Sequence, residues 1–178
     1  MSNMKYYFRV AASLLLICTV VSVLLAVVNG VTVDIIAVNE QKAKEDAIRN
    51  IYPALATMQT AEGEWAEGVN AVYTVYGEGE TLIGYAVDLN SAGFGGDINM
   101  MVGIDAAGTV VGTRVISHSE TPGLGSKATV DGHLAKYDGK NGEIPEKLDA
   151  VTGATISSKA IIAGINLALS LDLGGETV

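Results

Sequence analysis

The stretch "INMMVGIDAAGTVVGTRVIS", residues 98–117, decides the fold class of this chain. Its first half places an apolar side chain at every second position, the period of a half-buried β-strand: Ile98, Met100, Val102 and Ile104. The segment "DAAG" at 105–108 is typical of a turn, and the β-branched run at 109–117 predicts a returning strand. Together these features predict an antiparallel hairpin.

The same period of two occurs upstream of this hairpin, at 69–75 and at 83–89, on either side of the turn-like segment "GEGE" at 77–80. Downstream, a short helix is predicted over 127–137. The run "TISSKAIIAGINLALSL" at 155–171 has the composition of a helix, but it is too short to span a membrane. The predicted fold class is therefore α+β, with a mostly antiparallel, twisted sheet flanked by helices.

A long apolar run stands at the N-terminal end, "FRVAASLLLICTVVSVLLAVV" at 8–28. About twenty such residues suffice to cross the bilayer core as a helix, so a single transmembrane helix is predicted. Positive charge stays on the cytoplasmic side, and Lys5 and Arg9 lie at the start of the run. The first charges after it are Asp34 and Glu40. We therefore expect a single-pass protein of the cell membrane, with a cytoplasmic N-terminus and an extracytoplasmic domain.

A cleaved signal peptide is the alternative interpretation of this run. Signal peptides have apolar regions of about 7–15 residues, shorter than the run at 8–28, and "VNG" at 28–30 is a weak cleavage site. The only cysteine, Cys18, lies inside the run. The outer domain therefore has neither disulfides nor thiolate metal ligands.

The predicted domain organisation follows from the membrane helix. Residues 34–50 have loosely helical apolar spacing, and Pro53 ends that helix. The four predicted parts are a short cytoplasmic N-terminus (1–7), a transmembrane helix (8–30), a membrane-proximal helix and linker (31–60), and the extracytoplasmic domain (61–178).

The outer part of the chain is strongly acidic. All 20 acidic residues lie at or after Asp34, together with 9 of the 11 basic ones, so residues 34–178 carry a formal charge of −11. Nucleic-acid binding rests on neutralising phosphates with Lys and Arg, so this charge argues against a nucleic-acid partner. The two histidines, His118 and His133, lack a zinc-ligand spacing, and we predict no metal site.

Three stretches could hold an anion. The glycine-rich segments "AGFGGDI" (92–98) and "TPGLGSK" (121–127) match neither a Walker A nor a dinucleotide motif, and taken alone each is better explained by an ordinary turn. The third is "DAVTGAT" (149–155), just before a helix, where Asp149, Thr152 or Thr155 could cap the helix start. A helix start also favours a phosphate, and Lys159 shares the helix face of Thr155.

"DAVTGAT" resembles the flavinylation motif Asp-x-x-Ser/Thr-Gly-Ala-Thr of the RnfG/NqrC family. These proteins are FMN-binding subunits of the Rnf ferredoxin:NAD⁺ oxidoreductase and of the sodium-pumping NADH:quinone oxidoreductase. The N-terminal anchor, "GFGGDINMMVGID" (93–105) and "VISHSETPGLGSK" (115–127) also resemble that family, in the same order. The short outer domain favours the Rnf type.

The resemblance implies a covalent FMN, attached by a flavin transferase through a phosphoester to Thr155. It also implies roles for three groups of residues. The transferase recognises Asp149, Thr152, Gly153 and Ala154; a loop along the flavin comprises Glu120, Thr121, Pro122, Gly123, Leu124 and Gly125; and a second glycine-rich stretch contains Gly93, Gly95 and Gly96. The flavin performs the redox chemistry, so no further catalytic residue is expected.

The implied function is electron transfer within an Rnf-type complex that couples electron flow between ferredoxin and NAD⁺ to Na⁺ or H⁺ translocation. The implied partners are the other membrane and iron–sulfur subunits of that complex. Three alternatives remain at this point: an NqrC-type subunit, a stand-alone membrane-anchored flavoprotein, and a non-redox binding domain in which "VTGAT" only caps a helix.

Overall fold

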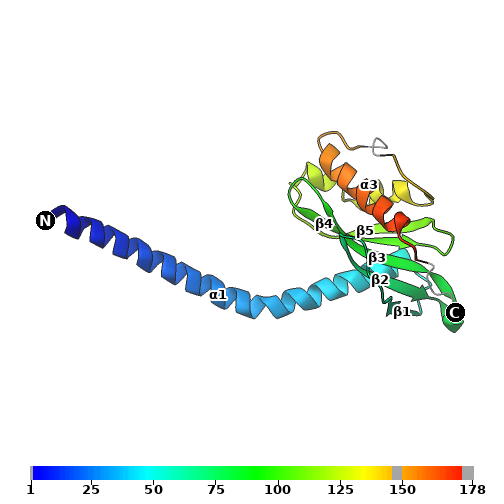
Figure 1. Ribbon diagram of the computed structural model, residues 1–178, viewed down its shortest axis with the longest axis horizontal. Coiled ribbons are helices and arrows are strands. Elements are labelled where there is room, and N and C mark those ends of the chain that lie inside the picture. The colour runs from blue at the N-terminus through cyan, green and yellow to red at the C-terminus, as the bar shows by residue number, and fades with distance from the viewer. Residues whose placement is uncertain (1, 146–149, 174–178) are drawn as a thin grey trace. The chain divides into compact units, whose positions relative to one another are not determined.

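The computed structural model describes residues 2–145 and 150–173 (Figure 1). The chain divides into two compact units, Met1–Lys42 and Ala43–Val178. The first unit is helical, and the second contains the β-sheet. The predicted domain boundaries differ from this division and stay predictions.

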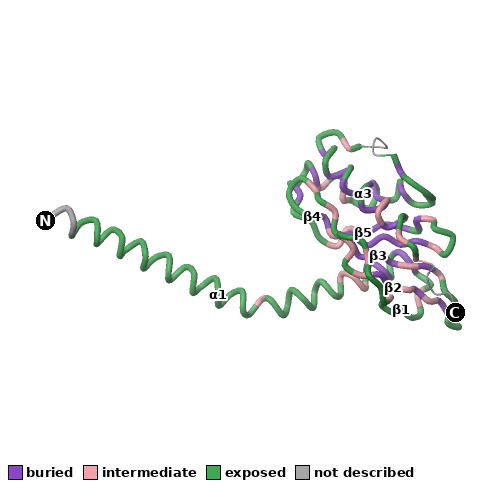
Figure 2. Tube along the Cα trace, in the orientation of Figure 1, coloured by how far each residue is buried: buried purple, intermediate pink, exposed green. Residues whose placement is uncertain are grey.

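Helix α1 (Ser2–Ile51) makes up the described part of the first unit and continues into the second. It is the one helix in the described chain that is long and apolar enough to cross a membrane, and none of its most apolar window is buried (Figure 2). So long a continuous apolar surface is unfavourable in water, which indicates that α1 anchors the chain in a membrane. The helix is unbroken between the predicted transmembrane and membrane-proximal segments.

The second unit is built on an antiparallel sheet with the order β1-β2-β3-β4-β5 (Figure 1). Its strands are β1 (Thr57–Thr60), β2 (Val69–Tyr76), β3 (Leu82–Ala92), β4 (Asp97–Ile104) and β5 (Val110–His118). The two predicted hairpins and the fold class are confirmed. A short 3₁₀ turn, η1 (Glu78–Glu80), connects β2 and β3. The sequence did not predict β1, because this four-residue edge strand is largely exposed and has no alternating apolar pattern.

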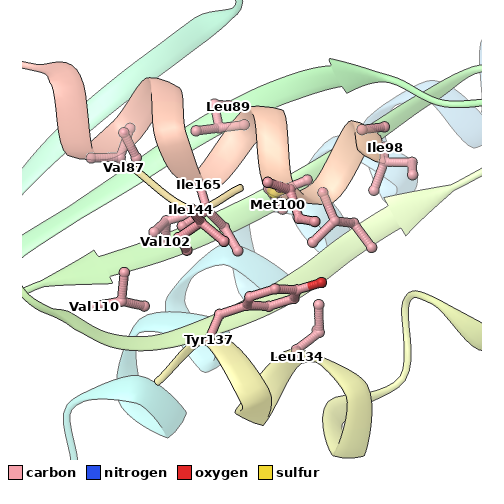
Figure 3. Close-up of a cluster of buried hydrophobic side chains, with 14 of the residues drawn as sticks. Val87, Leu89, Ile98, Met100, Val102, Val110, Leu134, Tyr137, Ile144 and Ile165 are labelled. Atoms are coloured by element: carbon pink, nitrogen blue, oxygen red, sulfur yellow. The ribbon is translucent and has the colours of Figure 1, made fainter. Parts of the chain in front are cut away.

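Helix α3 (Thr155–Ser170) covers one face of the sheet, in agreement with the prediction (Figure 1). Ile161, Ile162 and Ile165 are fully buried against the strands. The helix approaches closely at Gly164, where an added Cβ would lie 2.8 Å from Leu89. Figure 3 shows this core, which includes Val87, Leu89, Met100, Val102 and Tyr137.

The predicted helix over 127–137 is instead three short turns: η2 (Gly125–Lys127), α2 (Asp131–Leu134) and η3 (Ala135–Tyr137). Val130 separates the first two, because its backbone is extended (φ −78°, ψ 145°).

The C-terminal end of α1 covers the other face of the sheet. Ile48 and Ile51 are buried there, and an added Cβ at Gly103 would collide with Ile51. The fully buried Asp88 of β3 forms an ion pair with the Lys44 ammonium at 2.7 Å. Apolar packing and one ion pair therefore hold residues 43–51 on the sheet.

Candidate functional site

The centre of the candidate site is the buried side chain of Glu120, two residues after β5. Its Oε1 accepts the backbone N–H groups of Phe94 (2.7 Å) and Gly95 (3.3 Å), and its Oε2 accepts the hydroxyl of Ser157 (2.8 Å). The backbone N–H of Glu120 donates to Nδ1 of His118 at 3.2 Å. One carboxylate thus joins the loop between β3 and β4, the end of β5 and the first turn of α3.

Three glycines leave room for this carboxylate. A Cβ added at Gly93 or at Gly125 would collide with a Glu120 carboxylate oxygen, and one added at Gly95 would collide with the backbone of Ser119. Only glycine fits positions that a neighbouring group approaches so closely. The two glycine-rich stretches that looked like ordinary turns are therefore parts of one packed cluster.

The loop after Glu120 turns back on itself. Leu124 N–H donates to the Thr121 carbonyl at 3.1 Å, and Gly123 N–H donates to the Ser126 hydroxyl at 2.9 Å. Gly123 has φ +77°, a conformation that glycine adopts readily. The turn leaves the Leu124 side chain 53% exposed beside the start of α3.

Thr155 is the first residue of α3 and is exposed. The N-cap residue is Ala154, whose methyl group accepts no hydrogen bond. The prediction that Thr155 caps the helix is therefore wrong, because Thr155 already lies within the helix. Thr152 does not cap it either, because it lies two residues before the cap position. The preceding segment is fixed instead by Ser158, whose buried hydroxyl accepts the Val151 N–H at 3.1 Å.

These segments enclose a pocket of about 400 Å³. Its wall combines apolar side chains with hydroxyls and glycines: Phe94, Glu120, Thr121, Leu124, Gly125, Gly153, Ala154, Thr155, Ile156 and Ser157. The volume falls within the range of small-molecule sites, roughly 300–1,000 Å³.

The structure brings together seven of the residues that the sequence singled out. Glu120, Thr121, Leu124, Gly125 and the segment 153–155 all line the pocket.

Other predicted residues lie outside its wall. Gly95 contributes only its N–H to Glu120, and Gly96, Gly123, Thr152 and Lys159 are not among the lining residues. Lys159 is exposed, and its predicted role toward a phosphate stays a prediction. Asp149 lies outside the described residues.

Three lining residues were not predicted from the sequence: Phe94, Ile156 and Ser157. In the sequence, Phe94 is an aromatic residue between two glycines, and this is a signal that could have been used. The structure shows that Phe94 is 71% exposed. Nothing in the local pattern distinguishes Ser157, because its partner Glu120 is 37 residues away.

Glu120 is the one charged side chain among the described residues that line the pocket. Burial alone would raise its pKa. The hydrogen bonds from Ser157, Phe94 and Gly95 and the charge of His118 outweigh burial, so the pKa of Glu120 lies below its usual range. The carboxylate is therefore ionised at neutral pH.

The histidines have structural partners. His118 accepts the Glu120 N–H, and the ring of His133 lies 3.2 Å from the Tyr137 hydroxyl inside the core. Within residues 2–145 and 150–173, no three His, Cys, Asp or Glu side chains are grouped as metal ligands.

The residues that line the pocket lie within a region that matches a known family. A family model described as "FMN-binding domain" matches residues 93–170, which include every lining residue. The chain is 28% identical to the G subunit of the Na⁺-translocating ferredoxin:NAD⁺ oxidoreductase complex of Acetobacterium woodii, over 94% of this chain and 92% of that protein. It is 31% identical to the G subunit of the ion-translocating oxidoreductase complex of Stutzerimonas stutzeri, over 94% of this chain and 81% of the relative.

The chain belongs to the RnfG family, the G subunits of ion-translocating oxidoreductase complexes. Membership confirms the predicted family and the predicted type of redox subunit. A crystal structure of NqrC from Shewanella oneidensis is also similar, with a TM-score of 0.47 and 21% identity over 66% of this chain and 67% of that one.

The pocket of this RnfG-family protein fits an FMN. Phe94, Leu124 and Ile156 offer apolar surface for a flat aromatic ring, and the start of α3 offers N–H groups for a phosphate. The Thr155 hydroxyl belongs to the same wall.

Proposed function

We propose that this protein carries FMN covalently, through a phosphoester to the Thr155 hydroxyl. One observation carries the proposal: Thr155 is at once the first residue of α3 and part of the pocket wall. A phosphate bonded there is at the positive end of a helix, where negative charge is stabilised by roughly 0.3–1 kcal/mol at exposed positions. An exposed threonine is also accessible to a flavin transferase.

The flavin, when bound, supplies the electron transfer, and the residues of this chain hold it in place. The Glu120 carboxylate hydrogen-bonds both the Phe94 loop and Ser157 of α3. The Ser158 hydroxyl hydrogen-bonds Val151 in the segment before Thr155. The apolar surfaces of Leu124 and Ile156 exclude water from the pocket wall that they line. Covalent attachment prevents loss of the cofactor from an extracytoplasmic domain.

The proposed reaction is electron transfer between ferredoxin and NAD⁺, coupled to translocation of Na⁺ or H⁺. The relative from Acetobacterium woodii is named for Na⁺ translocation. A relative from Clostridium ljungdahlii is named for proton translocation, and it is 27% identical over 91% of this chain and 89% of its own length. Both are subunits of ferredoxin:NAD⁺ oxidoreductases, which supports membership of a complex over a stand-alone flavoprotein. The proposed partners are the membrane and iron–sulfur subunits of such a complex.

The attachment is tested by Thr155→Val in protein co-expressed with a flavin transferase. We expect the wild type to fluoresce under ultraviolet light on a denaturing gel and the variant to fold but remain dark, because valine lacks the hydroxyl that forms the ester.

The matched control is Thr57→Val, which makes the same change at an exposed position of β1 and should leave the band fluorescent. A fluorescent Thr155→Val band would refute the assignment of Thr155. Intact mass of the protein from its own membrane provides an independent measure of the added FMN.

A further inference from the structure

The charge of the Glu120 carboxylate has no counterpart among the described residues of the pocket wall; His118, whose charge also lowers the Glu120 pKa, is not one of the lining residues. Among the described lining residues there is no Lys, Arg or His. The groups that satisfy the two carboxylate oxygens are two backbone N–H groups and one hydroxyl, all of them neutral. Such donors hold the carboxylate in its ionised form but do not cancel its net charge.

The position of Glu120 limits direct contact between its charge and water. Its side chain belongs to a residue that is 4% exposed. Apolar side chains such as Phe94 and Leu124 form other parts of the same wall. Charge close to a flavin ring is one of the means by which a protein tunes the electronics of the ring.

The positive end of α3 does not cancel this effect. Helix-terminal N–H groups act within the first turn, and a phosphate bonded to Thr155 would add negative charge at that turn. Among the described side chains of the pocket wall, Glu120 carries the one charge, and it is negative. A negative charge near a flavin ring would oppose the addition of an electron to that ring.

We propose that Glu120 is a positioning residue that sets the flavin potential: it holds the Phe94 loop on α3, and its charge keeps the midpoint potential of the bound flavin low. The proposal rests on the proposed FMN attachment.

The direct test is Glu120→Gln in the full-length, flavin-loaded protein. Glutamine keeps the side-chain length, and its amide oxygen can still accept the Phe94 and Gly95 N–H groups, while its NH₂ group can donate to Ser157. We expect an upward shift of the midpoint potential in a redox titration followed by flavin absorbance. Flavin loading is measured separately by gel fluorescence.

The matched control is Asp131→Asn, which removes the same formal charge from a side chain that is 76% exposed on α2. Because water screens that charge, we expect a much smaller shift than for Glu120→Gln. Equal shifts in the two variants, or no shift in Glu120→Gln, would overturn the proposal.

Ser157→Ala separates charge from geometry. It removes the hydroxyl donor but leaves the carboxylate charged and less well stabilised, so the potential is expected to fall or to stay unchanged. A rise comparable to that of Glu120→Gln would show that the loop geometry sets the potential, and would overturn the proposal.

A further variant covers the case in which Glu120→Gln does not take up flavin. Ile156→Lys places a cation on the same wall at a side chain that is 52% exposed, and it should raise the potential if charge on this wall acts on the flavin ring, as the proposal requires of Glu120. An unchanged potential would overturn the proposal. Wild-type protein without flavin would refute the attachment and this proposal together, whereas loaded variants with the wild-type potential refute this proposal alone.

Discussion

At the scale of single residues, Gly125 shows how tightly the site is packed. A Cβ there would collide with the Glu120 carboxylate and lie 2.8 Å from Ser157 Oγ. We expect Gly125→Ala to lower the free energy of unfolding by about 1–3 kcal/mol, the usual cost of overpacking. It should also reduce flavin loading, because Glu120 must move. Unfolding of the flavin-free protein can be followed by the fluorescence of Trp65, the only tryptophan, which packs against the core.

The control for this change is Gly132→Ala in α2, where an added Cβ meets nothing within 4 Å. There the free energy of unfolding should stay unchanged or rise by up to about 1 kcal/mol, because alanine favours helix. Equal destabilisation by both substitutions would contradict the packing argument at Gly125.

At the scale of elements, the C-terminal end of α1, residues 43–51, packs on one face of the sheet. Ile48 is 1% exposed and packs with Val75, Ala86 and Met101 of the sheet. Ile48→Ala should therefore lower the free energy of unfolding of the second unit by about 2–5 kcal/mol. The measurement is denaturant unfolding of the full chain, read from Trp65.

Asn50→Ala is the matched control, since Asn50 is exposed on the same turn of α1. Its effect should stay within about 0.5 kcal/mol. If Ile48→Ala lowered the free energy of unfolding as little as Asn50→Ala, the C-terminal end of α1 would not form part of the folded unit.

At the scale of the whole molecule, the orientation in the membrane can be tested by cysteine labelling. In a Cys18→Ser background, a cysteine at the exposed Lys140 should react with a membrane-impermeant maleimide in intact cells. A cysteine at Lys5 should react only after permeabilisation, because we expect the positive charges of Lys5 and Arg9 to keep that end in the cytoplasm. Labelling of the Lys5 position in intact cells would reverse the proposed topology.

The sequence predicted those parts of the fold that a local pattern encodes. The alternation of apolar and polar side chains predicted β2 to β5, because successive side chains of a strand point to opposite faces. The continuous apolar run predicted the membrane helix, because its length matches the thickness of the bilayer core. It did not predict β1, and it merged the three turns within 125–137 into one helix. Short exposed elements have few consecutive buried positions and therefore leave little pattern.

For the site, the sequence by itself determined which parts are available: a threonine at the start of a helix, and two glycine-rich stretches. Only the tertiary structure decided that Phe94, Glu120 and Ser157 meet. Glu120 lies 26 residues after Phe94 and 37 residues before Ser157. These residues come together because β4 and β5 form a hairpin and α3 packs on the sheet. A contact between segments so far apart in the sequence has no local signature, because its energy comes from the folded core.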